Sequence, residues 1–234
     1  MLALKLGNSI VSSFNTSSNQ YAISFNGTDE YVSADSVTTD MSATEGTFSV
    51  WVKVKTHSSN GFMLQARNDT NNQISLFYHN GTGETRFLYK AGGTATTIVI
   101  TDDLEDDGSW NHIAATFKKS TNELEIFLNG VSKATSSSTL GTFSGSLSLF
   151  DIGQNTANAG YFNGDVSNAA VFTRKVPIAE LFQVKQPPVN LTGSEGLVGF
   201  WRFNEGSGTT AFDNSGEGNN ATLFNTPSWI TDTP

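Results

Sequence analysis

Residues 110–130 read WNHIAATFKKSTNELEIFLNG, and this stretch decides the fold. Apolar and polar side chains alternate with a period of two over 112–118 and again over 123–128. Such alternation is expected of two strands that each bury one face. The polar residues between the strands suit a hairpin loop, and Asn129-Gly130 can adopt the positive φ angles of a second tight turn. The stretch therefore predicts an antiparallel β-hairpin.

The same alternation recurs along most of the chain. It is clearest in FSVWVKVK at 48–55. Polar and glycine-rich clusters separate further strand-like segments, which lie at 21–27, 30–34, 61–66, 73–79, 85–90, 96–101, 146–152, 165–173, 196–204 and 220–225. Many short strands predict an all-β sandwich, in which the apolar sides of 48–54 and 124–128 face each other across the core.

One short helix is expected near 177–185. Val176-Pro177 precedes IAELFQVKQ, and Pro187-Pro188 follows it. Proline is favoured at the first helical position and stops a helix at its end, so the segment is expected to form one or two turns.

Composition sets limits on function. The chain of 234 residues has no cysteine, which excludes disulfides and thiolate metal sites. Its net charge of −9 argues against nucleic-acid or anionic-membrane partners, because both need clustered Lys and Arg. No apolar run is long enough to span a bilayer, and the N-terminus lacks the apolar core of a signal peptide. The chain is therefore expected to stay in the cytoplasm or to leave the cell without a signal.

Several sequence blocks together resemble the concanavalin A-like lectin/glucanase superfamily, and more narrowly its laminin G-like and pentraxin-like members. The blocks cover residues 21–225 and read ISFNGTDEYV, GTFSVWVKV, WNHIAATF with LEIFLNG, IGQNTANAGYFNGDVSNAAVFTRKVPIAEL and GLVGFWRFNEGSGTTAFDNSGEGNNATL. The resemblance implies a jelly-roll β-sandwich of two antiparallel sheets. We expect residues 19–234 to form this single domain, and the polar, aperiodic residues 1–18 to form an N-terminal arm or a docked edge segment.

The order of these blocks departs from that of many relatives. The block at 196–225 opens the domain in those relatives, whereas here it closes the chain. We interpret this as a circular permutation within one domain, because so short a segment cannot bury a core alone. The arrangement, with the leader LGNS and the tail ITDTP, is also similar to structural proteins of tailed bacteriophages.

The resemblance also suggests where a ligand would bind. Pentraxin-like members bind calcium, and a ligand through it, at one edge of the sandwich. In this sequence the carboxylates expected there are absent, since the matching positions are Asn71, Gln73, Asn155 and Ala157, so that calcium site is expected to be lost. The remaining hypothesis is a metal-free polar groove in which Asn71, Asn72, Asn155 and Tyr161 hydrogen-bond a sugar. The alternative is that these side chains are ordinary loop residues.

A second place for a metal is the segment DNSGEGNN. Asp213, Asn214 and Glu217 could form a structural calcium loop, although Asn214-Ser215-Gly216 also suits a simple turn. No other cofactor is expected.

Catalysis distinguishes the glucanases of this superfamily from its lectins. Laminarinase-like members carry E-x-D-x-x-E on one strand, and the nearest match here starts at Glu123 and has Leu128 in place of the last acid. Retaining glycosidases need two carboxylates across the scissile bond. We therefore predict no catalytic residues and interpret Glu123 and Glu125 as solvated strand side chains.

The main hypothesis is a non-enzymatic virion protein of a bacteriophage, either a capsid decoration, a head-fibre or a tail-associated lectin-like module. It would assemble in the host cytoplasm with other virion proteins and copies of itself, and its loops would touch host or environmental glycans with avidity. The alternative is an extracellular carbohydrate-binding or adhesion module of a secreted cellular protein. A glycoside hydrolase is the third hypothesis.

Overall fold

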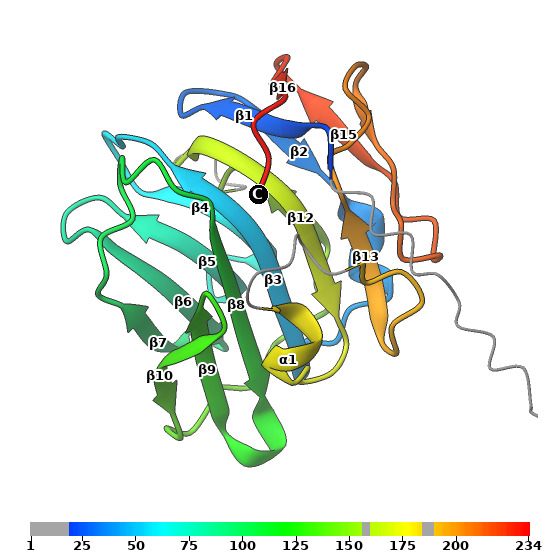
Figure 1. Ribbon diagram of the computed structural model, residues 1–234. Coiled ribbons are helices and arrows are strands. Elements are labelled where there is room, and N and C mark those ends of the chain that lie inside the picture. Colours follow the sequence, from blue (N-terminus) through cyan, green and yellow to red (C-terminus); the bar gives the residue numbers. More distant parts are fainter. Residues whose placement is uncertain (1–18, 156–159, 184–189) are drawn as a thin grey trace, which may run out of the picture.

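The computed structural model describes residues 19–155, 160–183 and 190–234, which form two antiparallel sheets packed face to face (Figure 1). From edge to edge, sheet A consists of β10 (Val131–Ser136), β9 (Glu123–Leu128), β8 (Asn111–Lys118), β3 (Glu45–Val54), β12 (Asn163–Phe172), β1 (Ala22–Asn26) and β16 (Ser228–Ile230), and β13 (Leu197–Trp201) also pairs with β12. Sheet B consists of β14 (Thr210–Ala211), β15 (Ala221–Phe224), β2 (Tyr31–Ser33), β11 (Leu149–Ile152), β4 (Gly61–Asp69), β5 (Asn72–His79), β6 (Glu84–Ala91) and β7 (Thr94–Ile100). The predicted all-β sandwich is confirmed.

The hairpin that decides the fold forms as predicted. Strands β8 and β9 pair with Ile113 opposite Leu128, and a 3-10 turn, η2 (Lys119–Thr121), lies between them. At the next turn, Asn129 has a φ of 49° and Gly130 a φ of 78°. Positive φ at both central residues is typical of the hairpin turns whose twist matches that of the strands.

The core lies between the two sheets, but one expectation about it is wrong. The apolar residues of 48–54 and 124–128 are buried, yet β3 and β9 belong to the same sheet and line one wall of the core. The opposite wall comes from sheet B, whose Phe87 and Phe150 pack edge-on against Phe48. Alternation shows that one face of a strand is buried, but it does not show which sheet holds the strand.

The single α-helix of the described residues, α1 (Ile178–Leu181), lies within the predicted segment 177–185. Figure 1 shows it in yellow in front of sheet A. Its Leu181 joins a small apolar cluster on the outer face of that sheet, which also contains Ala114, Phe127, Ala170, Phe172, Val176, Leu191, Leu197 and Phe200. No helix among the described residues is long and apolar enough to cross a bilayer. A 3-10 helix, η1 (Asp35–Thr39), follows β2.

The C-terminal strands belong to both sheets. Strand β16 pairs with β1, β15 pairs with β2, and β13 pairs with β12. Trp201 of β13 is fully buried in the common core. The strand order does not itself show how the relatives are arranged, so the circular permutation stays a prediction. The expected arm at 1–18 lies outside the described residues.

Candidate functional site

The four residues expected to line a polar groove lie at opposite ends of β4. Asn71 and Asn72 form the turn after this strand. Asn155 and Tyr161 belong to the segment at its other end, since the backbone just before Tyr161 accepts a hydrogen bond from the start of β4. A strand of nine residues is about 26 Å long. The four side chains therefore do not line one groove, and sugar contact by any of them stays a prediction.

Asn72 has a structural task of its own. Its side chain is buried, and its Nδ2 donates to Asp69 Oδ1 at 3.0 Å and Oδ2 at 3.1 Å. Its Oδ1 accepts from the backbone of Gly92 at 3.0 Å and of Ser144 at 2.9 Å. The side-chain amide of Asn72 thus links three loops at this end of sheet B. The neighbouring Asn71 is exposed.

The proposed calcium loop at Asp213, Asn214 and Glu217 is held by hydrogen bonds. The carboxylate of Asp213 accepts four of them, from the backbone of Phe200, Ser215 and Asn219 and from the Ser215 hydroxyl. Within the described ranges, no group of three or more His, Asp and Glu side chains is placed to hold a metal ion. The geometry of this loop is that of the simple turn.

The glutamates considered for cleavage lie in a groove of about 640 Å³ on the outer face of sheet A, beside α1. Lys175 Nζ lies 3.5 Å from a carboxylate oxygen of Glu123 and 3.4 Å from one of Glu125. In the same groove Lys118 pairs with Glu45 and lowers the pKa of that carboxyl below its ordinary value. The lysine beside Glu45 favours the charged form of that carboxyl group, which makes Glu45 a poor proton donor.

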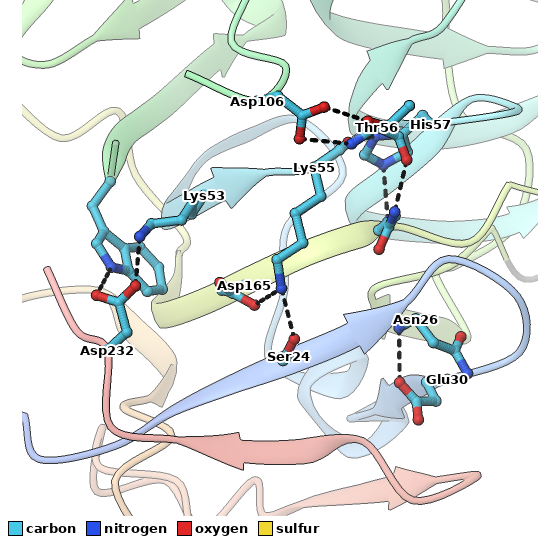
Figure 2. A network of polar contacts seen from close by, with 12 residues as sticks. Ser24, Asn26, Glu30, Lys53, Lys55, Thr56, His57, Asp106, Asp165 and Asp232 are labelled. Atoms are coloured by element: carbon cyan, nitrogen blue, oxygen red, sulfur yellow. Dashed lines mark hydrogen bonds and ion pairs between the residues drawn. The ribbon is translucent and has the colours of Figure 1, made fainter. Parts of the chain in front are cut away.

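At the end of β3, polar side chains on the outer face of sheet A also form hydrogen bonds and ion pairs with one another (Figure 2). Lys55 Nζ bonds Asp165 at 2.6 Å and Ser24 at 3.0 Å, and Lys53 Nζ bonds Asp232 at 2.5 Å. His57 is buried beside them, and burial lowers its pKa below the ordinary value. These groups bond one another and do not form an open site.

The outer face of sheet B is different, because a row of polar side chains crosses it. Asp151 of β11 lies opposite Ser33 of β2 and Gln65 of β4, and Gln65 lies opposite Ser75 of β5. Their neighbours along the strands face the core, namely Val32, Phe150, Ile152, Leu64, Ala66, Ile74 and Leu76. Successive side chains of a strand point to opposite faces, so the row lies on the side turned away from the core.

These polar side chains are buried, although they are not part of the core. Asp151 is 4% exposed, and Gln65 is 0% exposed. Gln65 Nε2 donates to Ser75 Oγ at 2.9 Å, and Gln154 Nε2 donates to Asp151 Oδ2 at 3.0 Å. Gln154 Oε1 is also buried, and it has no hydrogen-bond partner among the described residues. A buried acceptor without a partner leaves a position that a donor on a ligand or water would satisfy.

Asp151 is the most perturbed carboxyl group of this face. Its pKa is raised from 3.8 to about 7, chiefly by burial and to a smaller extent by the charge of Asp35. Hydrogen bonds from Gln154 and Ser33 and the charge of Arg67 lower it, but burial prevails. A carboxyl group held in this way costs stability when it ionises, and such groups are concentrated at functional sites.

Two pairs of stacked aromatic rings lie beside the polar row. Tyr31 of β2 and Phe224 of β15 stack with centroids 4.8 Å apart and an interplanar angle of 6°. Phe62 of β4 and Phe77 of β5 stack at the same distance with an angle of 13°. Phe62 and Phe77 are almost buried, whereas Phe224 is 40% exposed. On this face, buried polar groups therefore lie beside one partly exposed ring, Phe224.

Tyr161, one of the residues predicted from the sequence, lies near this face. The pKa of the Tyr31 phenol is raised by burial first, and then by the nearby Asp151, Tyr161 and Asp35. The residues predicted from the sequence include Tyr161 but not Asp151, Gln65 and Tyr31. The available signal was weak, since it consisted of polar or aromatic residues at the outward positions of strands.

The comparisons with known proteins agree with this architecture. The family model of the concanavalin A-like lectin/glucanases superfamily matches residues 26–181. The chain belongs to this superfamily. The resemblance seen in the sequence blocks is thereby confirmed. A search of the curated proteins found no similar sequence.

Solved structures of this superfamily share the fold at low sequence identity. A candidate carbohydrate-binding protein from Bacteroides ovatus is 19% identical with a TM-score of 0.66, and the match covers 92% of this chain but 60% of that one. The CBM40 of a Ruminococcus gnavus IT-sialidase is 17% identical with a TM-score of 0.58, covering 70% of this chain and 95% of that one. A SAP-like pentraxin from Limulus polyphemus is 13% identical with a TM-score of 0.52, covering 72% and 84%. At such identities the likeness shows the fold alone.

Proposed function

We propose that this concanavalin A-like domain binds carbohydrate without cleaving it, on the outer face of sheet B. The observation that carries the proposal is the partly exposed stack of Tyr31 and Phe224 beside Asp151 and the unpartnered Oε1 of Gln154. A sugar ring has an apolar C–H face that packs on an aromatic ring, and hydroxyl groups that bond amides and carboxylates.

Structural relatives support the proposal. The CBM40 of the Ruminococcus gnavus IT-sialidase was solved bound to α2,3-sialyllactose and to α2,6-sialyllactose. A domain of the Geobacillus stearothermophilus arabinanase AbnA was solved in complex with arabinotriose. The same sandwich therefore holds glycans in other proteins. Transfer of that property to this chain is our inference.

We infer a non-catalytic role from the incomplete cleavage motif. Glu123 and Glu125, the nearest match to that motif, both lie beside Lys175, and Leu128 stands in place of the last acid. A retaining glycosidase needs one carboxyl group to donate a proton while a second attacks the sugar.

The test of the function is a glycan array, followed by calorimetric titration of the sugars that bind. We expect Phe224→Ala to weaken binding about tenfold, because one stacking surface is lost at a cost of roughly 1.4 kcal/mol. The control is Val131→Ala, which truncates another exposed apolar side chain, on sheet A; Val131 is 59% exposed, compared with 40% for Phe224. An array without any hit, or equal losses in the two variants, would contradict the proposal.

We separately propose that this protein is part of a bacteriophage particle, and this proposal rests on the order of the sequence blocks. It is tested by mass spectrometry of purified virions from the source. Absence of the polypeptide from the particles would favour the alternative, an extracellular adhesion module of a cellular protein.

A further inference from the structure

A sheet edge with free backbone groups is a pairing site unless it is short, bulged, charged or covered. Most edges of the described sandwich are protected in one of these ways. Strand β14 has two residues and β16 has three. Strand β13 is covered, since the backbone of Asn214 bonds Phe200. Strand β10 has a bulge between Ser132 and Ala134, where Lys133 is the extra residue.

Strand β7 is not short, bulged or charged, although β9 and β10 of sheet A lie close to it. It runs for seven residues, TATTIVI, and it pairs with β6 in an unbroken register from Thr94 to Ile100. It contains no charged residue and no proline, and its Thr, Val and Ile side chains favour extended backbone. Among the described strands, β6 is its one pairing partner. Half of its backbone N–H and C=O groups therefore point away from the sheet.

We propose that β7 pairs with β7 of a second copy of this chain, antiparallel and about a two-fold axis at Thr97. In that register Thr97 lies opposite itself, Val99 lies opposite Ala95, and Ile98 lies opposite Thr96. No charged side chains meet within the paired strands, so the strand is complementary to itself. Such an isologous pair closes with two-fold symmetry and leaves no further β7 edge exposed.

The acidic residues that follow β7 do not oppose this partner. Asp102 is paired with Lys133 of β10 in the same chain at 2.8 Å, and Asp103 accepts a hydrogen bond from the Tyr78 hydroxyl at 3.3 Å. Antiparallel pairing places these residues of the two copies at opposite ends of the paired strands. They therefore do not repel each other at close range, although each chain has a net charge of −9.

The pairing has a consequence that rests on the proposed function. A two-fold axis perpendicular to the sheet keeps the outer faces of both copies on the same side. Asp151 lies four strands from β7, so the two Asp151 sites would be about 40 Å apart at the usual spacing of 4.8 Å between strands. The dimer would then present two glycan sites to one surface and gain avidity.

Sedimentation equilibrium of the full chain over a range of concentrations tests the pairing. We expect a monomer–dimer equilibrium that Thr97→Lys shifts to monomer, since two ammonium groups would meet at the axis. Thr135→Lys is the control, because Thr135 is equally exposed on the bulged edge β10. Mixing Thr97→Lys with Thr97→Asp should restore a dimer. Thermal unfolding shows whether each variant is folded.

A second experiment needs no charge change. The chain has no cysteine, so Thr97→Cys introduces a single thiol. Opposed residues of an antiparallel pair have Cα atoms about 4.5–5.5 Å apart, a distance that a disulfide spans. Under mild oxidation we expect this variant to cross-link faster than Thr135→Cys.

Two results would overturn the pairing: a native chain that stays monomeric at all concentrations, or a dimer that Thr97→Lys leaves intact. The proposed function is tested separately by the glycan affinity of each site, which Thr97→Lys should not change. A dimer without glycan binding would remove the proposed function and keep the pairing.

Discussion

Replacing Asp151 by asparagine should stabilise the protein in neutral and alkaline solution. The pKa of this carboxyl group is about 7 in the folded protein, compared with 3.8 when it is free in water. Each pKa unit corresponds to 1.36 kcal/mol, so a difference of about three units amounts to about 4 kcal/mol. The hydrogen bonds from Gln154 and Ser33 are weaker to a neutral amide, so this figure is an upper bound for Asp151→Asn.

The sign of the effect fixes its pH range. Below pH 4 the group is protonated in both the folded and the unfolded chain, and the substitution should change little. Between pH 4 and 7 the unfolded chain loses the proton first, so the stability of the native protein falls as pH rises. Above pH 7 the cost is complete, and the variant should be more stable by up to about 4 kcal/mol.

Urea unfolding followed by tryptophan fluorescence at several pH values measures this difference directly. Glu217→Gln serves as the control, because Glu217 is exposed and its side chain has no part in the site. The control should leave the pH profile of stability unchanged. Parallel pH profiles for the native protein and Asp151→Asn would refute the claim that a buried, ionisable carboxyl group lies on the outer face of sheet B.

Three further predictions concern other parts of the chain. Asn72→Ala should lower the free energy of unfolding by about 3 kcal/mol, since four hydrogen bonds of roughly 0.5–1.5 kcal/mol each are lost. Asn71 is exposed, so Asn71→Ala should change the free energy of unfolding little in the same urea titration. Gly61→Ala should lower the thermal midpoint, because a Cβ there would lie 2.2 Å from His57 Nε2, and an unchanged midpoint would contradict this packing. Calcium or EDTA should leave the midpoint unchanged, because the Asp213 carboxylate is occupied by internal hydrogen bonds.

Much of the fold could be predicted from the sequence, because alternation of apolar and polar residues is a local signal. Residues 48–55 and 110–130 show it clearly, and both form the expected strands. Strands β10, β14 and β16 were missed. VSKATS of β10 has no apolar side, since its residues are mostly exposed, and the other two strands are too short to show a period.

The candidate site could be predicted only in part, because its residues come from separate strands. Gln65 and Ser75 lie on one hairpin, but Asp151 is far from both in the sequence and meets them through the order β11-β4-β5. Each residue, taken alone, looks like any polar residue on the outward side of a strand. The order of strands in a sheet depends on long-range pairing, which the local period does not encode. The role predicted for Tyr161 in sugar contact stays a prediction.

The most direct test of the central claim is the crystal structure of the protein with a glycan from the array. We expect a sugar ring packed on Phe224 and Tyr31, with hydroxyl groups directed to Asp151 and Gln154. A sugar in the groove beside α1, or at the turn of Asn71 and Asn72, would contradict it.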